Sequence, residues 1–355
     1  MHLKEILELT IAKKASDLHI TAGEPPIIRI DGDLIHTGFS VLSPDETKSL
    51  IYGILNDSQK VRFEEELELD ISLYLPGVSR FRVNVHMQKG AVEAAFRAIP
   101  MEVPHIDTLG LPEVARTLAR KPTGLVLITG PTGTGKSTTM AAMVDLINRE
   151  RRCLIISAED PIEYLHQNKE SIIKQREVGS DTHSFAAALK HVLRQDPDVL
   201  LVGEMRDLET IATTLTAAET GHLVISSLHT PDAAQTVDRL IDVFPPSQQK
   251  QVMVQLAGCL QGVLAQVLLP LKNEKGRVVA TEVMIGTPGV RNVIREHKTH
   301  QIPTQIQTGS QYGMHTLDQS LKKLVLSGKV RYADALVHVK NAESFRDIPD
   351  NIKED

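Results

Sequence analysis

Residues 124–139 read GLVLITGPTGTGKSTT, and no other stretch of the chain says more about its architecture. An apolar run is followed by the pattern G-x-x-x-x-G-K-[ST], in its expected place between a buried strand and a helix. In this pattern the backbone N–H groups of the loop and the positive end of the helix surround a polyphosphate. A glycine-rich turn without a ligand would leave the lysine–serine pair unexplained.

The loop predicts a site for ATP and Mg²⁺. Lys136 would reach the β- and γ-phosphates, and the hydroxyl of Ser137 would bind Mg²⁺. The predicted nucleotide-binding residues are Gly130, Pro131, Thr132, Gly133, Thr134, Gly135, Lys136, Ser137 and Thr138.

Composition limits the class of protein. The chain has 355 residues, 41% of them apolar, which is enough for two domains with real cores. A net charge of −6 without a long Lys/Arg run argues against general nucleic-acid binding. Aromatic residues make up 3% with no Trp, which also disfavours base stacking.

Targeting signals and cysteine usage both favour a cytoplasmic protein. Residues 1–15 carry several charges and are no signal peptide, and no apolar stretch approaches membrane-spanning length. Cys153 and Cys259 lie in apolar surroundings and are expected to be reduced. No CxxC pair is present, which excludes a cysteine zinc site.

Residues 1–99 have the pattern of a small α+β domain. Strict alternation over 80–87 and again over 92–99 places apolar and polar side chains on opposite faces of two strands. The other predicted elements are a helix over 3–11, strands over 17–20 and 27–30, a turn at Asp31-Gly32, and a helix that starts at a capping box on Ser43.

Prolines and glycines over 100–112 predict a linker, after which strands and helices alternate. This alternation is typical of an α/β domain with a parallel sheet and crossover helices, here over 113–355. From Pro246 onward the chain is predicted to be mostly helical. Strands are predicted at 125–129, 153–157, 198–202 and 222–227, and helices at 136–149, 184–195, 207–219, 232–242, 247–268, 288–297, 313–326 and 331–339.

Carboxylates follow two of the predicted strands. The run VLLVGE over 199–204 is a buried strand ending in Glu204, the Walker B arrangement, at the sheet edge where ligands bind in open α/β sheets. Glu204 could hold Mg²⁺ through water or activate the attacking water. The alternative is a carboxylate that only caps the next helix, for which Asp207 is better placed.

Three more acids, Glu159, Asp160 and Glu163, crowd the end of the strand after the loop helix. Their repulsion favours a metal–phosphate site, with solvated loop acids as the alternative. The predicted metal ligands are therefore Ser137, Glu204, Glu159 and Asp160. We favour Glu163 as the residue that polarises water and Glu204 as support for the metal, although the choice of base stays open.

His229 follows the strand predicted over 222–227 and would lie at the same sheet edge as the loop and Glu204. A lone histidine at a strand end is usually a surface residue, so position alone assigns it no role.

Four blocks in this order resemble the secretion ATPase superfamily of type II secretion and type IV pilus motors. The resemblance covers nearly the whole chain. It implies a RecA-like domain preceded by a PAS-like domain, a hexameric ring, and a role for His229 in sensing the γ-phosphate. The blocks are Walker A at Gly130–Ser137, the Asp box AEDPIEYLH at 158–166, Walker B at 199–204 and the His box GHLVISSLH at 221–229.

Within this superfamily, GVRNVIRE over 289–296 resembles the AIRNLIRE motif of the pilus-retraction ATPases, the PilT family. The resemblance implies a motor for pilus retraction and twitching motility, acting with a platform protein at the cytoplasmic face of the inner membrane. Gly289 stands where the motif has Ala, which slightly weakens a helix start. As the alternative, Arg291, Arg295 and Glu296 are ordinary solvated charges.

Arg82 and Arg97 match the arginine-finger positions of the family. Strand alternation independently places both on polar faces, and the planar guanidinium grips phosphate oxygens bidentately. The alternative is a pair of arginines on a solvated sheet face.

Three other functions compete with retraction. An assembly-type ATPase is disfavoured because the tetracysteine site and a longer N-terminal region are missing. A RecA-like nucleic-acid motor is disfavoured by charge and low aromatic content, and a non-hydrolysing ring subunit by the complete set of site residues. The direction of work, the order of firing, the platform contact surface, and whether the arginines act on their own or a neighbouring subunit's nucleotide stay open.

Overall fold

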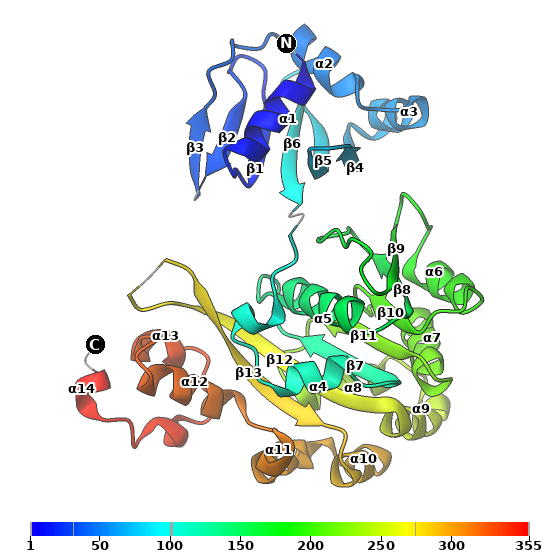
Figure 1. The fold of residues 1–355 in the computed structure, drawn as a ribbon, viewed down its shortest axis with the longest axis vertical. Helices are drawn as coiled ribbons and strands as arrows, with labels where there is room; N and C mark the ends of the chain where they lie inside the picture. Colours follow the sequence, from blue (N-terminus) through cyan, green and yellow to red (C-terminus); the bar gives the residue numbers. More distant parts are fainter. Residues whose placement is uncertain (1, 31, 100–101, 274, 354–355) are drawn as a thin grey trace. The chain divides into compact units, whose positions relative to one another are not determined.

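The structure is a computed structural model that describes residues 2–30, 32–99, 102–273 and 275–353 (Figure 1). The chain divides into two compact units. One consists of Met1–Glu102 with Glu163–Leu165, and the other of Val103–Ile162 with His166–Asp355.

The first unit is an antiparallel sheet of six strands in the order β3-β2-β1-β6-β5-β4. Its strands are β1 Asp17–Ile20, β2 Ile27–Ile30, β3 Asp33–His36, β4 Glu68–Leu75, β5 Ser79–Gln88 and β6 Ala91–Ile99. Its helices are α1 Leu3–Ala12, α2 Pro44–Tyr52 and α3 Asp57–Glu66. The helices and one face of the sheet share a single core, and most of the polar side chains of the strands lie on the opposite face.

The helices and strands predicted for this unit are present, with the alternation that the sequence shows. In β5 the alternation buries Phe81, Val83 and Val85 completely. The capping box also forms, because Ser43 Oγ accepts from the Glu46 N–H while the Glu46 carboxylate accepts from the Ser43 N–H at 2.8 Å. Asp31 of the predicted turn lies outside the described residues.

The second unit is built on a sheet of seven strands in the order β13-β12-β7-β11-β10-β8-β9. All neighbouring pairs are parallel except β12 with β13. The strands are β7 Gly124–Thr129, β8 Leu154–Glu159, β9 Ile172–Glu177, β10 Val199–Val202, β11 Leu223–Leu228, β12 Leu260–Pro270 and β13 Arg277–Ile285. This arrangement confirms the predicted α/β class.

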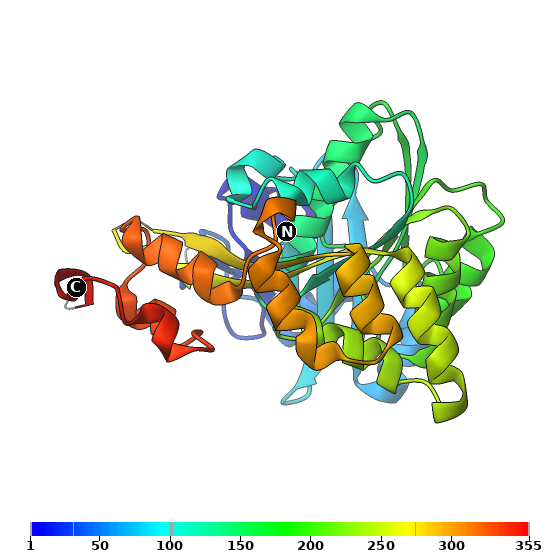
Figure 2. The ribbon, with the colours of Figure 1, turned by 90° about the horizontal axis from the view of Figure 1, so that it is seen from below.

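Helices cover both faces of this sheet. One core contains side chains from the 3₁₀ helix η1, α4 and α5, and another contains side chains from α6 to α11. Figure 2 shows the yellow and orange helices of the second layer in front of the sheet. The helices are η1 Ile106–Leu109, α4 Val114–Ala119, α5 Lys136–Glu150, α6 Phe185–Val192, α7 Leu208–Glu219, α8 Ala233–Asp242, α9 Pro246–Cys259, α10 Pro288–Arg295 and α11 Ile302–Thr308.

Helices predominate again after β13, as predicted. A further cluster joins Val267 and Leu269 of β12 to the last helices. These elements are the 3₁₀ helices η2 Thr299–Gln301, η3 Ser310–Tyr312 and η4 Ala342–Phe345, and the α-helices α12 Leu317–Leu326, α13 Tyr332–Leu336 and α14 Asp350–Lys353.

The prediction of one helix over 247–268 is wrong. Helix α9 ends at Cys259, and the chain continues directly into β12, which pairs in parallel with β7 and antiparallel with β13. The strand is buried along almost its whole length, so apolar residues lie on both of its faces and its sequence does not alternate. Periodicity cannot distinguish such a strand from a buried helix.

The expected linker and cysteines also have defined surroundings. Pro100 and Met101 lie outside the described residues, whereas η1 is packed, with Ile106 buried in the core that contains α5. The second unit therefore begins at Val103, within the predicted linker. Both cysteines are free, and burial raises the pKa of the Cys259 thiol to about 12.

Candidate functional site

The phosphate loop connects β7 to α5, and its backbone requires glycine. Gly130 has φ +139°, and a Cβ atom there would lie 2.3 Å from the carbonyl oxygen of Gln266. Gly135, the N-cap of α5, has φ +84°. Both torsions lie in a region that residues with side chains rarely adopt. The loop backbone therefore lies close to β12, with no room for a side chain at Gly130.

Lys136 lies at the centre of the loop. Its ammonium group donates to the carbonyl oxygens of Gly130 at 2.8 Å and Pro131 at 2.9 Å. The residue is only 8% exposed, so its charge is held among backbone carbonyls. Ser137 and Thr138 follow in the first turn of α5 and are half-buried, while Thr132 and Gly133 are exposed at the loop tip. A glycine cradle with a buried cation fits a polyphosphate group.

His229 connects this lysine to Glu204. Its Nδ1 lies 3.4 Å from Lys136 Nζ, and its Nε2 lies 3.1 Å from Glu204 Oε2. A neutral imidazole with its proton on Nε2 satisfies both contacts, because the lysine donates and the carboxylate accepts. The other oxygen of Glu204 pairs with Arg206. The structure therefore brings together three predicted residues from the ends of β7, β10 and β11.

The backbone at these strand ends is tied across the sheet. Ser227 Oγ donates to the carbonyl oxygen of Gly203 at 2.6 Å, and the Met205 N–H donates to the carbonyl oxygen of Ser227. Asp207 caps α7, as the sequence indicated, so Glu204 is not needed as a cap. Glu204 is buried and its carboxylate faces His229.

The acidic stretch after β8 is arranged differently. Glu159 is half-buried and accepts from Ser157 Oγ at 2.6 Å and Gln175 Nε2 at 3.1 Å, whereas Asp160 and Glu163 are exposed. These contacts do not link the three acids to the Lys136–His229–Glu204 cluster. The peptide bond between Asp160 and Pro161 is cis.

A buried acid that the sequence reading missed shapes this stretch. Glu177, only 4% exposed at the end of β9, accepts the Ile162 N–H at 3.0 Å. No signal in the sequence sets Glu177 apart, because strand β9 was not predicted.

Mg²⁺ fits the site only as an ion shared with phosphates. Among the residues that the structure describes, no three His, Cys, Asp or Glu side chains form a group that could hold a metal. Mg²⁺ at phosphate sites is typically held by one or two protein oxygens, phosphate oxygens and water. The hydroxyl of Ser137 and the carboxylate of Glu204 are of this kind.

Arg82 and Arg97 lie on the polar face of the first unit, directly opposite each other on β5 and β6. Like charges in such a pair repel, and an anion between them would relieve the repulsion. Asp17 of β1 is also directly opposite Arg97 and binds its Nε at 2.9 Å. Burial acts to raise the pKa of Asp17, but hydrogen bonds from Ser16 and Arg97 outweigh it and hold the pKa below its ordinary value.

The GVRNVIRE segment contains one structural arginine. Arg291 donates through Nε to the carbonyl oxygen of Gly286 at 2.7 Å and through its terminal nitrogens to Ala257 and Leu260. Arg291 therefore caps carbonyl groups at the carboxyl end of α9 and is not an ordinary solvated charge. Arg295 and Glu296 are exposed.

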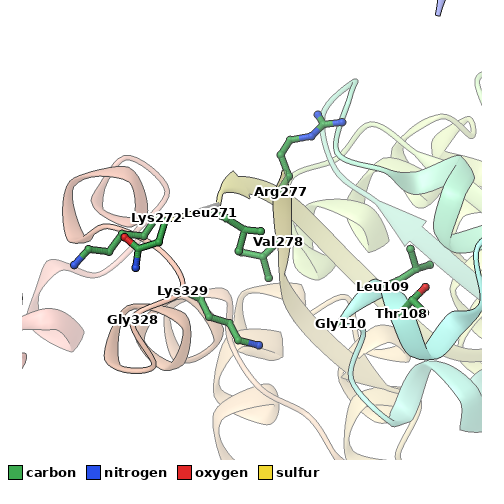
Figure 3. A pocket seen from close by; sticks show the side chains of 10 residues that line it. Thr108, Leu109, Gly110, Leu271, Lys272, Arg277, Val278, Gly328 and Lys329 are labelled. Carbon is green, nitrogen blue, oxygen red and sulfur yellow. The ribbon is translucent and has the colours of Figure 1, made fainter. Parts of the chain in front are cut away.

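A pocket of about 370 Å³ lies apart from these residues, at the turn between β12 and β13 (Figure 3). Its lining includes Lys272, Arg277 and Lys329 but none of the predicted site residues. Figure 3 shows the three cationic side chains pointing in different directions, so they do not converge on one ligand.

Comparisons with known proteins identify the family of the chain. The family described as "Type II/IV secretion system protein" matches residues 1–337. The chain is 49% identical to the "Type IV pilus retractation ATPase PilT" of Pseudomonas aeruginosa, over 97% of this chain and all of that protein. It is 45% identical to the "Twitching motility protein" of Neisseria gonorrhoeae, over 94% and 90%.

A solved structure is similar over nearly the whole chain. The crystal structure of the pilus retraction motor PilT with bound ADP superposes with a TM-score of 0.90 at 44% identity, covering 97% of this chain and 98% of that one. In the part of the chain that the structure describes, none of the helices is both long and apolar enough to cross a membrane. From the family match and these relatives, the chain belongs to the type II/IV secretion system protein family and is similar to its pilus-retraction ATPases.

Proposed function

We propose that this chain is an Mg²⁺-dependent ATPase that powers the retraction of type IV pili and thereby twitching motility. It would act as a homohexamer at the cytoplasmic face of the inner membrane, against a platform protein of the pilus machine. The proposed domains are a PAS-like domain over 1–99, a linker over 100–112 and a RecA-like ATPase domain over 113–355. The observation that carries the proposal is the contact of His229 with both Lys136 and Glu204.

Lys136 and His229 would respond to the nucleotide together. The lysine now bonds to loop carbonyls and would exchange them for phosphate oxygens. Any shift of its ammonium group changes the contact with His229 Nδ1, which is coupled through the imidazole to Glu204. In this way, binding of a γ-phosphate would change the contact of His229 with Glu204, which follows β10. Mg²⁺, when bound, neutralises charge on the phosphates, with Ser137 and Glu204 as its proposed protein ligands and Glu159 and Asp160 as further candidates.

Glu163 would orient the attacking water. Glu204 pairs with His229 and Arg206, whereas Glu163 is exposed. Arg82 and Arg97 would supply positive charge to the phosphates of a nucleotide in their own or a neighbouring subunit. Such arginines contribute on the order of 10³–10⁵ to the rate.

The first test is ATP turnover by purified Lys136→Ala, with Lys190→Ala, an exposed lysine of α6, as control. Lys136→Ala should lose turnover while the control keeps it, and wild-type turnover without Lys136 would rule out the assignment. Glu163→Gln and Glu204→Gln are then compared at saturating ATP. If both turn over normally, the catalytic placement is wrong.

The direction of work is tested by deletion in a pilus-bearing cell. Retraction predicts excess surface pili and loss of twitching, because assembly continues without a motor for disassembly. Loss of pili would instead indicate an assembly ATPase.

A further inference from the structure

Gln266 on β12 contacts the phosphate loop through a buried side chain. It is 2% exposed, and its Nε2 donates to the carbonyl oxygen of Thr134 at 2.6 Å. Its Oε1 accepts from Thr139 Oγ1 at 3.0 Å. One amide therefore joins the last part of the loop to the first turn of α5. Sequence analysis does not predict this role, because one of several glutamines in a stretch predicted to be helical carries no sign of a site.

The bond to Thr134 orients the peptide that follows it. In a trans peptide unit the carbonyl oxygen and the next N–H point in opposite directions. Holding the Thr134 oxygen toward β12 turns the Gly135 N–H away from β12. The backbone N–H groups on that side are those that bind phosphate in such a loop.

Gln266 contacts the other end of the loop as well, through its backbone. Its carbonyl oxygen lies only 2.3 Å from where a Cβ atom of residue 130 would be, so β12 packs directly against Gly130. Both ends of the loop are thus set against one residue of a neighbouring strand.

We propose that Gln266 is a positioning residue for phosphate binding, which fixes the Thr134–Gly135 peptide with its N–H toward the nucleotide. It would not touch the nucleotide itself. The inference rests on the proposed binding of ATP by this loop, and it adds a determinant from outside the loop and from outside the four motif blocks.

The same strand offers a matched control. Gln261 of β12 also donates its Nε2 to a backbone carbonyl, that of Thr123 at 3.0 Å, immediately before β7. Gln261 therefore supports the start of β7, and Gln266 supports the loop after its end. Loss of either amide removes one side-chain bond to a carbonyl, but only one of the two carbonyls lies in the phosphate loop.

The experiment measures the dissociation constant for ADP and the melting temperature of full-length Gln266→Met and Gln261→Met. Methionine keeps an unbranched side chain of similar length but cannot donate to a carbonyl. Gln266→Met should weaken ADP binding about tenfold, because a buried carbonyl is left unsatisfied and the loop peptide is free to turn. Gln261→Met should stay within about twofold, with a similar loss of melting temperature.

Two more variants test the proposal if the methionine variants fold poorly. Gln266→Glu has the shape of Gln, but its carboxylate cannot donate to Thr134, so its ADP binding should be at least as weak as that of the Met variant. Thr139→Val removes only the contact at Oε1 and should bind ADP within about threefold of wild type.

Equal ADP affinity of wild type and Gln266→Glu would overturn the proposal, as would an equal loss in Gln261→Met. Failure of the wild type itself to bind ADP would contradict the proposed function instead, so the two failures are distinguishable.

Discussion

The two sheets of this protein carry their candidate functional residues in different places. The seven-stranded sheet of the second unit is covered on both faces, and its polar groups gather at the ends of β7, β10 and β11. The six-stranded sheet of the first unit is covered on one face, and Arg82 and Arg97 lie on the other. A parallel sheet with both faces buried has only its strand ends available for chemistry, whereas a half-covered antiparallel sheet has a face.

The difference also decides how the residues depend on one another. At the strand ends, Lys136, His229 and Glu204 come from three separate loops and are joined through one imidazole. On the sheet face, Arg82, Arg97 and Asp17 are neighbours by strand register. We therefore expect strong coupling at the sheet edge and effects confined to single residues and their direct partners on the sheet face.

The largest expected effect concerns Arg97 on the polar face of the six-stranded sheet. Arg97→Ala should lower kcat for ATP hydrolysis about 10³-fold, because a positive charge at the phosphates is lost. Arg97→Lys should restore little of it, since an ammonium group lacks the bidentate fork. Arg62→Ala, which removes an exposed arginine of α3 paired with Glu66, is the control. If Arg97→Ala kept full activity, Arg97 would be an arginine on a solvated sheet face with no role in hydrolysis.

Acid is expected to destabilise the second unit through His166, which lies between β8 and β9. Burial lowers the pKa of His166 from 6.5 to about 4. The unfolded chain therefore binds a proton below pH 6.5 that the folded chain resists, and stability falls as pH drops from 6.5 toward 4. This loss is on the order of 3 kcal/mol.

His166→Gln should flatten that part of the profile in urea unfolding between pH 7 and pH 4. His229→Gln serves as the control for loss of a histidine whose side chain is half-exposed. An unchanged slope in His166→Gln would show that other groups govern the acid response.

Coupling at the strand ends predicts a double-mutant result. His229→Ala and Glu204→Gln should each lower kcat about 10²-fold, and the double variant should be little worse than either. The reason is that each change alone already breaks the chain of contacts from Lys136. Multiplicative effects on kcat would mean that the two residues act separately.

The smallest effect is expected at Asp17. Asp17→Asn weakens the hold on Arg97 Nε and should lower kcat about tenfold or less, since a charged hydrogen bond becomes a neutral one. The same change in the Arg97→Ala background should have no further effect. A loss in that background would assign Asp17 a role of its own.

Much of the fold was predictable because its signals are local. The phosphate loop and the capping box at Ser43 are specified by neighbouring residues, as are strands β7, β8, β10 and β11 and helices α5 to α8. Strand β12 was not predicted, because a strand buried on both faces shows no alternation of apolar and polar residues. The contact of Gln266 with the loop was not predicted for the same reason. The structural role of Arg291 was equally unreadable, since its carbonyl partners at the end of α9, Ala257 and Leu260, lie 34 and 31 residues away along the chain.

The amino-acid sequence on its own specifies a loop for phosphate, a lysine and a serine to serve it, and carboxylates at neighbouring strand ends. The spacing of residues along the chain encodes these features, because all residues of each feature lie within one strand–loop–helix unit. Only the packed molecule shows that His229 lies between Lys136 and Glu204, that Arg82 faces Arg97, and that Gln266 supports the loop. Those contacts join segments far apart in the chain, and strand order and register in the finished sheets bring them together.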